Sequence, residues 1–302
     1  MSNLVAVTGA NGFVGRHFVK EIGCLAKPIS RSHLSHPNSV VVDKIDSDTD
    51  WSIALDGCRV VIHLAALAHN QSQDINLIEK VNVHGAVKIF EQAIEKGVKR
   101  FIYISTIGIH GTSSYSNPFK SNDVENPNGP YANSKLAAEK ELKKMASGYD
   151  IDLVIIRPPL IYGKDAPGNF SSMVDFVRKS PFLPFGASRN RRDFISIYNF
   201  VDLLKYCLNA EDVKGKIILP SDNNTMTMSE FTTELALCMG KEIYQVPIPI
   251  FLFRWGAKLI GKEKIFLQLF GNLEIELASN DISWLPKYSV HDSLCFLKDS
   301  LK

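Results

Sequence analysis

The segment VTGANGFVGRH, near the start of the chain, constrains the fold more than any other part of the sequence. It follows the apolar run at residues 4–7, which predicts a buried strand, and it leads into a helical pattern over residues 12–23. Glycine at Gly9, Gly12 and Gly15 lets the backbone turn tightly between the two elements. The start of the helix then offers unpaired N–H groups to an anion. We therefore expect a strand–turn–helix unit that binds the pyrophosphate of a dinucleotide.

Short apolar runs alternate with helical patterns through the first half of the chain. Strands are expected at residues 4–7, 27–30, 40–42, 59–66, 100–106 and 152–159. Helices are expected at residues 12–23, 77–97 and 131–145. Strands that are separated by crossover helices form a parallel sheet with helices on both faces. The predicted fold is therefore α/β, a Rossmann-type doubly wound parallel sheet.

The pattern loosens after Gly163, where we expect a smaller, interwoven C-terminal substrate lobe. The region after Gly163 has helical patterns near residues 170–180 and 199–210, a short strand at 216–220 and C-terminal helices, and it is expected to be interwoven with the sheet. The expected division gives the NAD(P)-binding domain residues 1–165 and about 193–221, and the substrate-binding lobe residues 166–192 and 222–302. The lobe should face the carboxyl ends of the strands, where ligands bind in open α/β sheets.

Composition argues against several classes of protein. Apolar residues make up 45% and charged residues 22% of the chain, as in ordinary globular proteins. The net charge is +2 and the basic residues are spread among acidic ones, so nucleic acid is not an expected partner. No segment reaches the roughly 20 apolar residues of a membrane span. The nearest candidate, IPIFLFRWGAKLIG, is cut by Arg254 and Lys258 and is expected to be an amphipathic helix on the protein.

The cysteines are Cys24, Cys58, Cys207, Cys238 and Cys295. They lie far apart and form no C-x-x-C pair, so we expect neither a disulfide framework nor a zinc site, and no metal ligands are assigned. Reduced thiols fit the cytoplasm, and the N-terminus has no signal-peptide pattern. We therefore expect a cytoplasmic protein.

Two residues at the end of the second expected strand bear on which dinucleotide is bound. An acidic residue at this point would favour NAD by bonding the ribose hydroxyls. The chain has Ser30 and Arg31 instead. A hydroxyl and a guanidinium suit a ribose phosphate, so NADP(H) is favoured and NAD(H) is the alternative. The competing interpretation of Arg31 is a solvated loop cation.

Four motifs follow one another along the chain: the T-G-x-x-G-x-x-G loop, HLAA, YIST and YANSK. In this order they resemble the extended short-chain dehydrogenase/reductases, in particular the NAD(P)-dependent nucleotide-sugar epimerase/dehydratase family. The resemblance covers nearly the whole chain. Further matching segments are RPPLIYG (157–163), RRDFISIYNFVDLL (191–204) and ISWLPKYSVHDSL (282–294).

The resemblance implies a catalytic group of Thr106, Tyr131 and Lys135. Tyr131 would be the acid/base, Lys135 its partner and Thr106 the hydroxyl that binds the reacting oxygen, with Ser105 as a helper. Lys135 lies one helical turn beyond Tyr131, so the two side chains share a face. A nearby ammonium and a nicotinium charge favour the phenolate of a residue whose unperturbed pKa is about 10. The alternatives are a surface Tyr–Lys pair and, for Thr106, a hydroxyl that caps the next turn.

The resemblance also implies contacts to cofactor and substrate. The expected cofactor contacts are Gly9, Asn11, Gly12, Phe13, Val14, Gly15, Ser30, Arg31, Leu64, Ala65, Ala66, Asn82, Tyr131, Lys135 and Pro158. The expected substrate contacts are Ser105, Thr106, Asn169 and Arg192, with the last two on the nucleotide diphosphate. The family's second phosphate-binding arginine, in an R-x-G-D segment, is missing between residues 270 and 290. The alternatives are a turn for Asn169, a surface ion pair for Arg192 and a locally bonded helix residue for Asn82.

Residues after Thr106 bear on the type of reaction. Relatives that dehydrate sugars carry Asp and Glu there, whereas this chain has Ile107 and Gly108, which cannot move a proton, so a 4,6-dehydratase is not expected. His110 either faces the substrate or is an ordinary loop histidine.

Arg31 and the GNF and RRDF segments favour a 4-ketoreductase acting on a UDP-4-keto-6-deoxy-N-acetylhexosamine in surface polysaccharide biosynthesis. A UDP-sugar 4-epimerase of the UDP-glucose or UDP-N-acetylglucosamine type is the first alternative. An NADPH-dependent reductase of a non-sugar ketone is the second. The resemblance further implies a homodimer through the two helices that precede and include Tyr131.

Overall fold

The computed structural model describes residues 3–67, 74–115, 117–259, 266 and 270–297. In this part of the chain, seven strands form one parallel sheet in the order β10-β6-β5-β4-β1-β2-β3. The strands are β1 (Leu4–Thr8), β2 (Ala26–Ser30), β3 (Val40–Val41), β4 (Cys58–His63), β5 (Arg100–Ile104), β6 (Asp152–Ile156) and β10 (Ile217–Ile218). The strand order reverses beside β1, which is the usual ligand-binding edge of such sheets. The predicted Rossmann-type doubly wound fold is confirmed.

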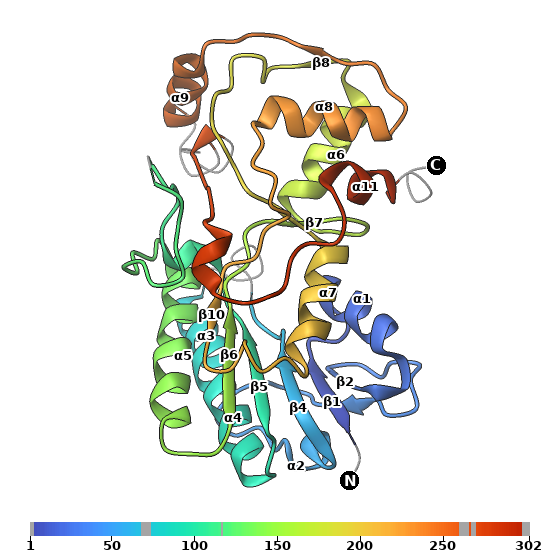
Figure 1. Ribbon diagram of the computed structural model, residues 1–302, viewed down its shortest axis with the longest axis vertical. Coiled ribbons are helices and arrows are strands. Elements are labelled where there is room, and N and C mark those ends of the chain that lie inside the picture. Colours follow the sequence, from blue (N-terminus) through green and yellow to red (C-terminus); the bar gives the residue numbers. More distant parts are fainter. Residues whose placement is uncertain (1–2, 68–73, 116, 260–265, 267–269, 298–302) are drawn as a thin grey trace.

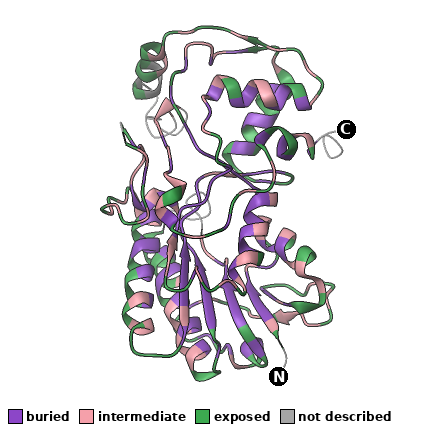
Figure 2. Ribbon diagram, in the orientation of Figure 1, coloured by how far each residue is buried: buried purple, intermediate pink, exposed green. Residues whose placement is uncertain are grey.

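Helices cover both faces of the sheet (Figure 1). The flanking helices are α1 (Phe13–Ile22), α3 (Ile75–Glu79), α4 (Gly85–Glu95), α5 (Pro130–Ala146) and α7 (Ile197–Cys207). Val5 and Val7 of β1 pack with α1 and α7, whereas Ala6 between them belongs to the cluster that contains α4 and α5. Side chains of a strand alternate between the two faces, so burial on both faces produces the continuous apolar runs seen in the sequence. Figure 2 shows these strands as predominantly buried.

The local sequence explains where the helices begin and end. Gly129 has φ +92°, a value that favours glycine, and Pro130 takes the first helical position of α5, where its missing N–H is harmless. The helix expected over residues 77–97 is α3 and α4 joined by one π-helical turn, Lys80–His84. It ends just before Gly97, whose φ is +71°.

A second group of elements stands beyond the carboxyl ends of the strands (Figure 1). It contains α6 (Asn169–Lys179), α8 (Met228–Cys238), α9 (Ile250–Leu259), α11 (Val290–Cys295) and the strand pair β8 (Phe182–Leu183) and β11 (Tyr244–Gln245). The pair β7 (Ile161–Tyr162) and β9 (Ile195–Ser196) leads toward it from the sheet. Phe170, Phe194 and Phe231 lie in its separate apolar core. Shorter elements are the helix α2 (Ser52–Leu55) and 3-10 turns at Gly23–Leu25, Ile107–Ile109 and Leu277–Asn280.

The apolar segment at residues 248–261 forms α9 over part of its length. Phe253 on one side packs against Phe270, with ring centroids 4.9 Å apart, whereas Phe251 and Trp255 are exposed. The helix is therefore amphipathic and packed on the protein, as expected. None of the described helices combines the length and the apolar character needed to cross a membrane.

The expectation that the cysteines form no disulfide is wrong. Cys238 at the end of α8 and Cys295 at the end of α11 are bonded to each other across 57 residues of sequence. The spacing of cysteines along the chain could not reveal this pair, because only the packing of α11 against α8 brings them together. Cys24, Cys58 and Cys207 are free thiols.

One buried carboxylate joins the sheet to the elements beyond it. Asp222 accepts hydrogen bonds from the Tyr162 hydroxyl at 2.6 Å, the Ser196 N–H at 3.0 Å and the Asn199 amide at 2.7 Å. Burial raises the pKa of Asp222, and the three donors act in the opposite direction. β7, β9 and α7 thus converge on a single side chain.

Asp222→Ala is expected to lower the free energy of unfolding by about 3 kcal/mol, because it leaves several buried donors without an acceptor. Urea denaturation measures the change. Asp175→Ala is the control, since Asp175 forms only an exposed ion pair with Arg178 at 3.8 Å; its expected effect is about 0.5 kcal/mol or less. Equal losses in both variants would contradict the role given to Asp222.

Candidate active site

The predicted site residues gather at the carboxyl edge of the sheet, where β1, β4 and β5 lie side by side. The glycine loop leaves β1 after Thr8, the HLAA segment begins at the end of β4, and Ser105 and Thr106 follow β5. Because β4 pairs with both neighbours in parallel, all three segments emerge at the same edge. Segments from positions 9, 64 and 105 of the chain thus meet in one place.

The glycine loop has no room for side chains at two positions. Gly9 has φ +66°, and a Cβ there would stand 2.9 Å from the Ala65 nitrogen. A Cβ on Gly15 would stand 2.3 Å from the Gly9 carbonyl oxygen. Helix α1 begins directly after Gly12, and no side chain caps its N-terminus. The first N–H groups of α1 are therefore available to an anion, and the loop fits the pyrophosphate of a dinucleotide.

A buried hydroxyl–imidazole pair holds the HLAA segment against the loop. Thr8 Oγ1 lies 3.0 Å from His63 Nδ1 and accepts a hydrogen bond from the Ala65 N–H at 3.2 Å. His63 is fully buried, and burial lowers its pKa to about 3, so the ring is neutral. Leu64 and Ala65 follow directly, and their backbone lies against Gly9 of the glycine loop. Ala66 is the next residue along the chain.

Asn82 connects the same region to helix α5. Its side chain accepts from the Leu67 N–H at 2.8 Å and donates to the Leu67 carbonyl at 3.1 Å and to Ser134 Oγ at 3.0 Å. Ser134 in turn donates to the Tyr131 carbonyl at 2.8 Å. Asn82 is thus bonded to groups far away in sequence, and its geometry is that of a residue that positions α5 and the segment after β4.

Tyr131 and Lys135 project from the first turns of α5. The Lys135 side chain is buried, with 1% of the residue exposed, and its Nζ donates to the Ile104 carbonyl at 2.7 Å. The same ammonium stands 4.5 Å from the centre of the Tyr103 ring. Burial lowers the pKa of Lys135 to about 7, against the opposing effect of the Glu139 carboxylate. Burial also raises the pKa of the partly exposed Tyr131 to about 12.

Two hydroxyls follow β5. Thr106 Oγ1 accepts from the Gly108 N–H at 3.1 Å, so it caps the short turn after it. This bond uses the oxygen lone pair and leaves the hydroxyl proton for another acceptor. Ser105 is buried, and its Oγ has no partner within the described structure. The Ile107 N–H donates to the carbonyl of Pro158, the second residue after β6, at 3.0 Å, which fixes this segment beside the end of β6.

A charged group that the sequence did not indicate lies one turn further along α5. Arg157 binds the Glu139 carboxylate with both ends of its guanidinium, at 3.0 and 2.6 Å, and it also contacts His110 Nε2 at 2.9 Å. Burial and the nearby Arg157 lower the pKa of His110 to about 4, so the ring is neutral and its Nε2 accepts. His110 is therefore a buried residue of the loop after Ile109, as the loop-histidine interpretation has it, and Arg157 holds its ring. The available signals were the four-residue spacing of Glu139 from Lys135 and an arginine directly after a buried strand.

The residues expected to select the dinucleotide lie at the end of β2. The Ser30 hydroxyl is mostly buried and donates to the Ser32 carbonyl. Arg31 is exposed and makes no hydrogen bond or ion pair with any residue that the structure describes. Its guanidinium is thus available to a ligand.

The two expected phosphate contacts belong to the elements beyond the sheet. Asn169 is exposed and begins α6. Arg192 is buried and donates from Nη1 to the Gly271 carbonyl at 2.5 Å, and burial lowers its pKa to about 10. Arg191 forms an exposed ion pair with Glu274 at 3.1 Å. The alternative interpretation of Arg192 from sequence is a surface ion pair. The structure shows such a pair at the neighbouring Arg191 instead.

Comparison with known proteins agrees with this architecture. A UDP-glucose 4-epimerase of Vibrio cholerae is 33% identical over 97% of this chain and 93% of its own length. The structure of a UDP-glucuronic acid 4-epimerase from Bacillus cereus in complex with NAD superimposes with a TM-score of 0.76, at 20% identity, over 99% of both chains. The structure of RMD from Pseudomonas aeruginosa complexed with NADPH gives a TM-score of 0.73, at 20% identity, over 99% of this chain and 98% of that one.

The family model described as the NAD dependent epimerase/dehydratase family matches residues 5–219, which span the sheet, the glycine loop and the YANSK helix. That match covers more than half of the chain and agrees with the resemblance found in its motifs. The protein belongs to the NAD-dependent epimerase/dehydratase family, among the extended short-chain dehydrogenase/reductases.

Proposed function

We propose that this protein is an NADPH-dependent 4-ketoreductase of a nucleotide-linked sugar, with a UDP-4-keto-6-deoxy-N-acetylhexosamine as the favoured substrate. The observation that carries the proposal is the exposed guanidinium of Arg31 at the carboxyl end of β2, which has no partner among the residues that the structure describes. A carboxylate at this point would bind the ribose hydroxyls of NAD, whereas a guanidinium suits the additional phosphate of NADP(H). A preference for NADPH favours net reduction, because each turnover consumes one reduced cofactor.

The residues at the carboxyl edge of the sheet have separate roles in the proposed reaction. The glycine loop, Arg31 and the backbone at 64–66 would hold the cofactor, which supplies a hydride when bound. Tyr131 donates its proton to the substrate oxygen, and the Lys135 ammonium stabilises the phenolate that this leaves. The hydroxyl proton of Thr106, free of the bond to Gly108, binds the same substrate oxygen. The carbonyl thus gains one hydride and one proton and becomes an alcohol.

Burial shifts the pKa values of Tyr131 and Lys135 in the directions that disfavour a phenolate and an ammonium. It raises the pKa of Tyr131 to about 12 and lowers that of Lys135 to about 7. Glu139 opposes part of the second shift, since its carboxylate favours the charged form of Lys135. Arg157 fixes the position of this carboxylate.

A UDP-sugar 4-epimerase is the second candidate, favoured by the similarity over 97% of the chain to the UDP-glucose 4-epimerase of Vibrio cholerae. An epimerase removes the hydride and returns it to the other face of the sugar, so Tyr131 would accept and then return the proton. The same side chains serve both reactions, and the difference lies in whether the cofactor is released. Ile107 and Gly108 carry no acid or base, which argues against a 4,6-dehydratase.

We propose further roles for the substrate lobe, the dimer interface and the cellular location of the protein. The lobe formed by residues 166–192 and 222–302 would bind the nucleotide through Asn169 and Arg192. The apolar core beyond the sheet draws most of its side chains from these ranges and also includes Tyr162 and Phe194. A homodimer through α4 and α5 and a cytoplasmic location are part of the same proposal. Completion of a nucleotide-linked deoxysugar for surface polysaccharide is the biological role that this chemistry would serve.

The reaction is tested by following NADPH absorbance after mixing the protein with a UDP-linked 4-keto-6-deoxy-N-acetylhexosamine. The proposal predicts loss of one NADPH per ketosugar, with weaker activity for NADH. UDP-N-acetylglucosamine is the parallel substrate. Its conversion to the 4-epimer without net change in cofactor would make the protein an epimerase and contradict the proposal.

Tyr131→Phe tests the role of the phenol in this assay. Tyr149→Phe is its matched control, because Tyr149 is an exposed tyrosine that follows the end of α5. Loss of the phenol proton should lower turnover roughly 1,000-fold while NADPH binding is kept. Turnover that is unchanged in Tyr131→Phe would remove this residue from the mechanism.

Arg31→Asp is expected to weaken NADPH binding roughly 10- to 100-fold, the value of a hydrogen bond between charged groups. Binding of NADH should be unchanged or tighter. Arg59→Asp is the matched control, because Arg59 is exposed on β4 at the opposite edge of the sheet. Fluorescence titration with both cofactors gives the affinities. An equal loss for NADPH and NADH would show that Arg31 does not read the ribose phosphate.

Arg192→Gln is expected to raise the KM for a UDP-sugar roughly 10- to 100-fold with a smaller change in kcat, because a diphosphate loses a charged partner. Arg191→Gln removes the neighbouring exposed cation and should leave KM unchanged. Steady-state kinetics separate the two constants, and circular dichroism checks the fold of the buried variant. An unaltered KM in a folded Arg192→Gln protein would favour a neutral, non-sugar ketone as substrate.

A further inference from the structure

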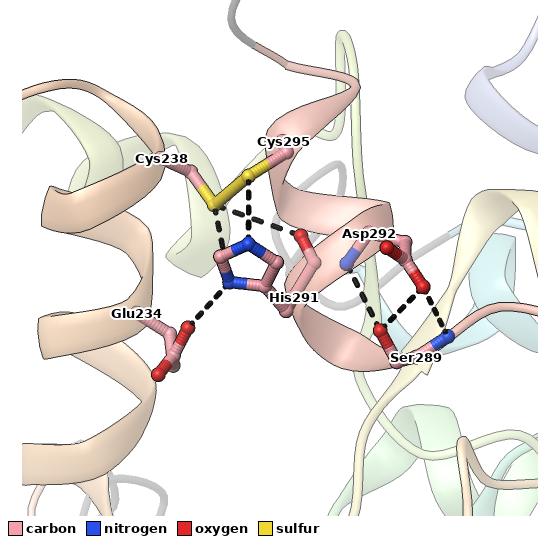
Figure 3. Close-up of a disulfide and its surroundings, with 6 residues drawn as sticks. All are labelled: Glu234, Cys238, Ser289, His291, Asp292 and Cys295. Carbon is pink, nitrogen blue, oxygen red and sulfur yellow. Dashed lines mark hydrogen bonds and ion pairs between the residues drawn. A yellow bond between two sulfur atoms is a disulfide. The ribbon is translucent and has the colours of Figure 1, made fainter.

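Four side chains with metal-binding groups meet between α8 and α11 (Figure 3). The two helices lie in the group of elements beyond the carboxyl ends of the strands (Figure 1). Glu234 and Cys238 lie four residues apart on α8, and His291 and Cys295 lie four residues apart on α11. Residues at this spacing project from the same face of a helix. Each helix therefore presents two such groups to the other, an arrangement that the spacing of cysteines alone could not reveal.

The His291 ring lies across the two sulfur atoms (Figure 3). Its Nδ1 stands 4.0 Å from Cys238 Sγ and its Nε2 stands 3.6 Å from Cys295 Sγ. The candidate ligand atoms of Cys238, His291 and Cys295 all lie within 4.8 Å of one another. A tetrahedral zinc ion has bonds of about 2.3 Å to sulfur and about 2.0 Å to nitrogen, so its ligand atoms stand a little under 4 Å apart. The distance between Nε2 and Cys295 Sγ fits this arrangement, whereas the two sulfur atoms are bonded to each other and must move apart for an ion to bind between them.

Glu234 determines which ring nitrogen is available. Its Oε2 lies 2.9 Å from His291 Nδ1, so the carboxylate accepts the Nδ1 proton and leaves the Nε2 lone pair free. A carboxylate behind a metal-binding imidazole orients the ring in the same way in metalloproteins and strengthens its basicity. Cys238 is buried, which keeps water away from one side of the cluster.

We propose that Cys238, His291 and Cys295 form a site for a divalent ion of the zinc class when the disulfide is reduced, with Glu234 orienting the imidazole. Two thiolates and one imidazole suit zinc, and a water molecule completes the tetrahedron. The two sulfurs and the carboxylate carry three negative charges, which a divalent cation reduces to one.

The disulfide and the metal exclude each other, because both use the same two sulfur atoms. A dithiol reductant transfers two electrons and two protons to the disulfide, which yields two cysteine thiols and an oxidised reductant. Binding of the ion then releases both thiol protons to solvent. In either state α11, near the end of the described chain, is tied to α8 of the substrate lobe.

The experiment measures Zn²⁺ binding to the full chain after reduction with a phosphine, in competition with a chromophoric chelator. We expect one Zn²⁺ per reduced chain and none for the oxidised chain. Co²⁺ should give the absorption bands of a tetrahedral, sulfur-ligated ion. Binding to the oxidised chain, or no binding to the reduced one, would overturn the proposal.

Variants identify the ligands. Cys238→Ser should weaken Zn²⁺ binding at least 100-fold, and Glu234→Gln about 10-fold, because it removes only the support for His291. Cys24→Ser is the matched control, since Cys24 is an exposed thiol outside the cluster. Glu234 is partly exposed, so its variant tests the site even if Cys238→Ser fails to fold. Binding that is lost equally in Cys24→Ser, or unaffected by Glu234→Gln, would also contradict the assignment.

Discussion

The ion pair between Arg157 and Glu139 fixes helix α5 to the carboxyl edge of the sheet. Both residues are almost completely buried, with 1% of Arg157 and none of Glu139 exposed. Burying two charges is costly unless the geometry is good, and here the guanidinium meets both carboxylate oxygens. The pair sets the position of α5, which carries Tyr131 and Lys135, relative to the strand ends. The placement of the proposed catalytic residues therefore depends on this contact, and the proposed mechanism gives neither Arg157 nor Glu139 a contact with a ligand.

The same helix places an ammonium in an environment that disfavours charge. Lys135 has the Ile104 carbonyl as its hydrogen-bond acceptor and the Tyr103 ring beside it. These neighbours and the Glu139 carboxylate offset part of the cost of burial, which still lowers the pKa of Lys135 to about 7. A buried ammonium is poorly solvated, so its attraction to a nearby phenolate is stronger than it would be in water. Such a site favours the formation of a negatively charged oxygen. In the proposed mechanism, this ammonium stabilises the phenolate of Tyr131.

Local patterns in the sequence were sufficient for the sheet, the glycine loop and the helix that carries YANSK. Strands buried on both faces are continuous apolar runs, and Gly9 and Gly15 are required by close backbone contacts that any such loop makes. The contacts made by Asn82, His110 and the Cys238–Cys295 pair could not be predicted in this way. Each joins segments that are tens of residues apart, and only the packed fold decides which side chains meet.

Hydride delivery to the sugar is tested most directly by supplying NADPH that carries deuterium at the transferable position of the nicotinamide. Mass spectrometry and NMR of the product from a UDP-4-keto-6-deoxy-N-acetylhexosamine then locate the label. One deuterium at the fourth carbon of the sugar, absent with Tyr131→Phe, is the predicted result. A product without deuterium at that carbon, formed while NADPH is unchanged, would contradict a ketoreductase and support a cofactor-retaining epimerase.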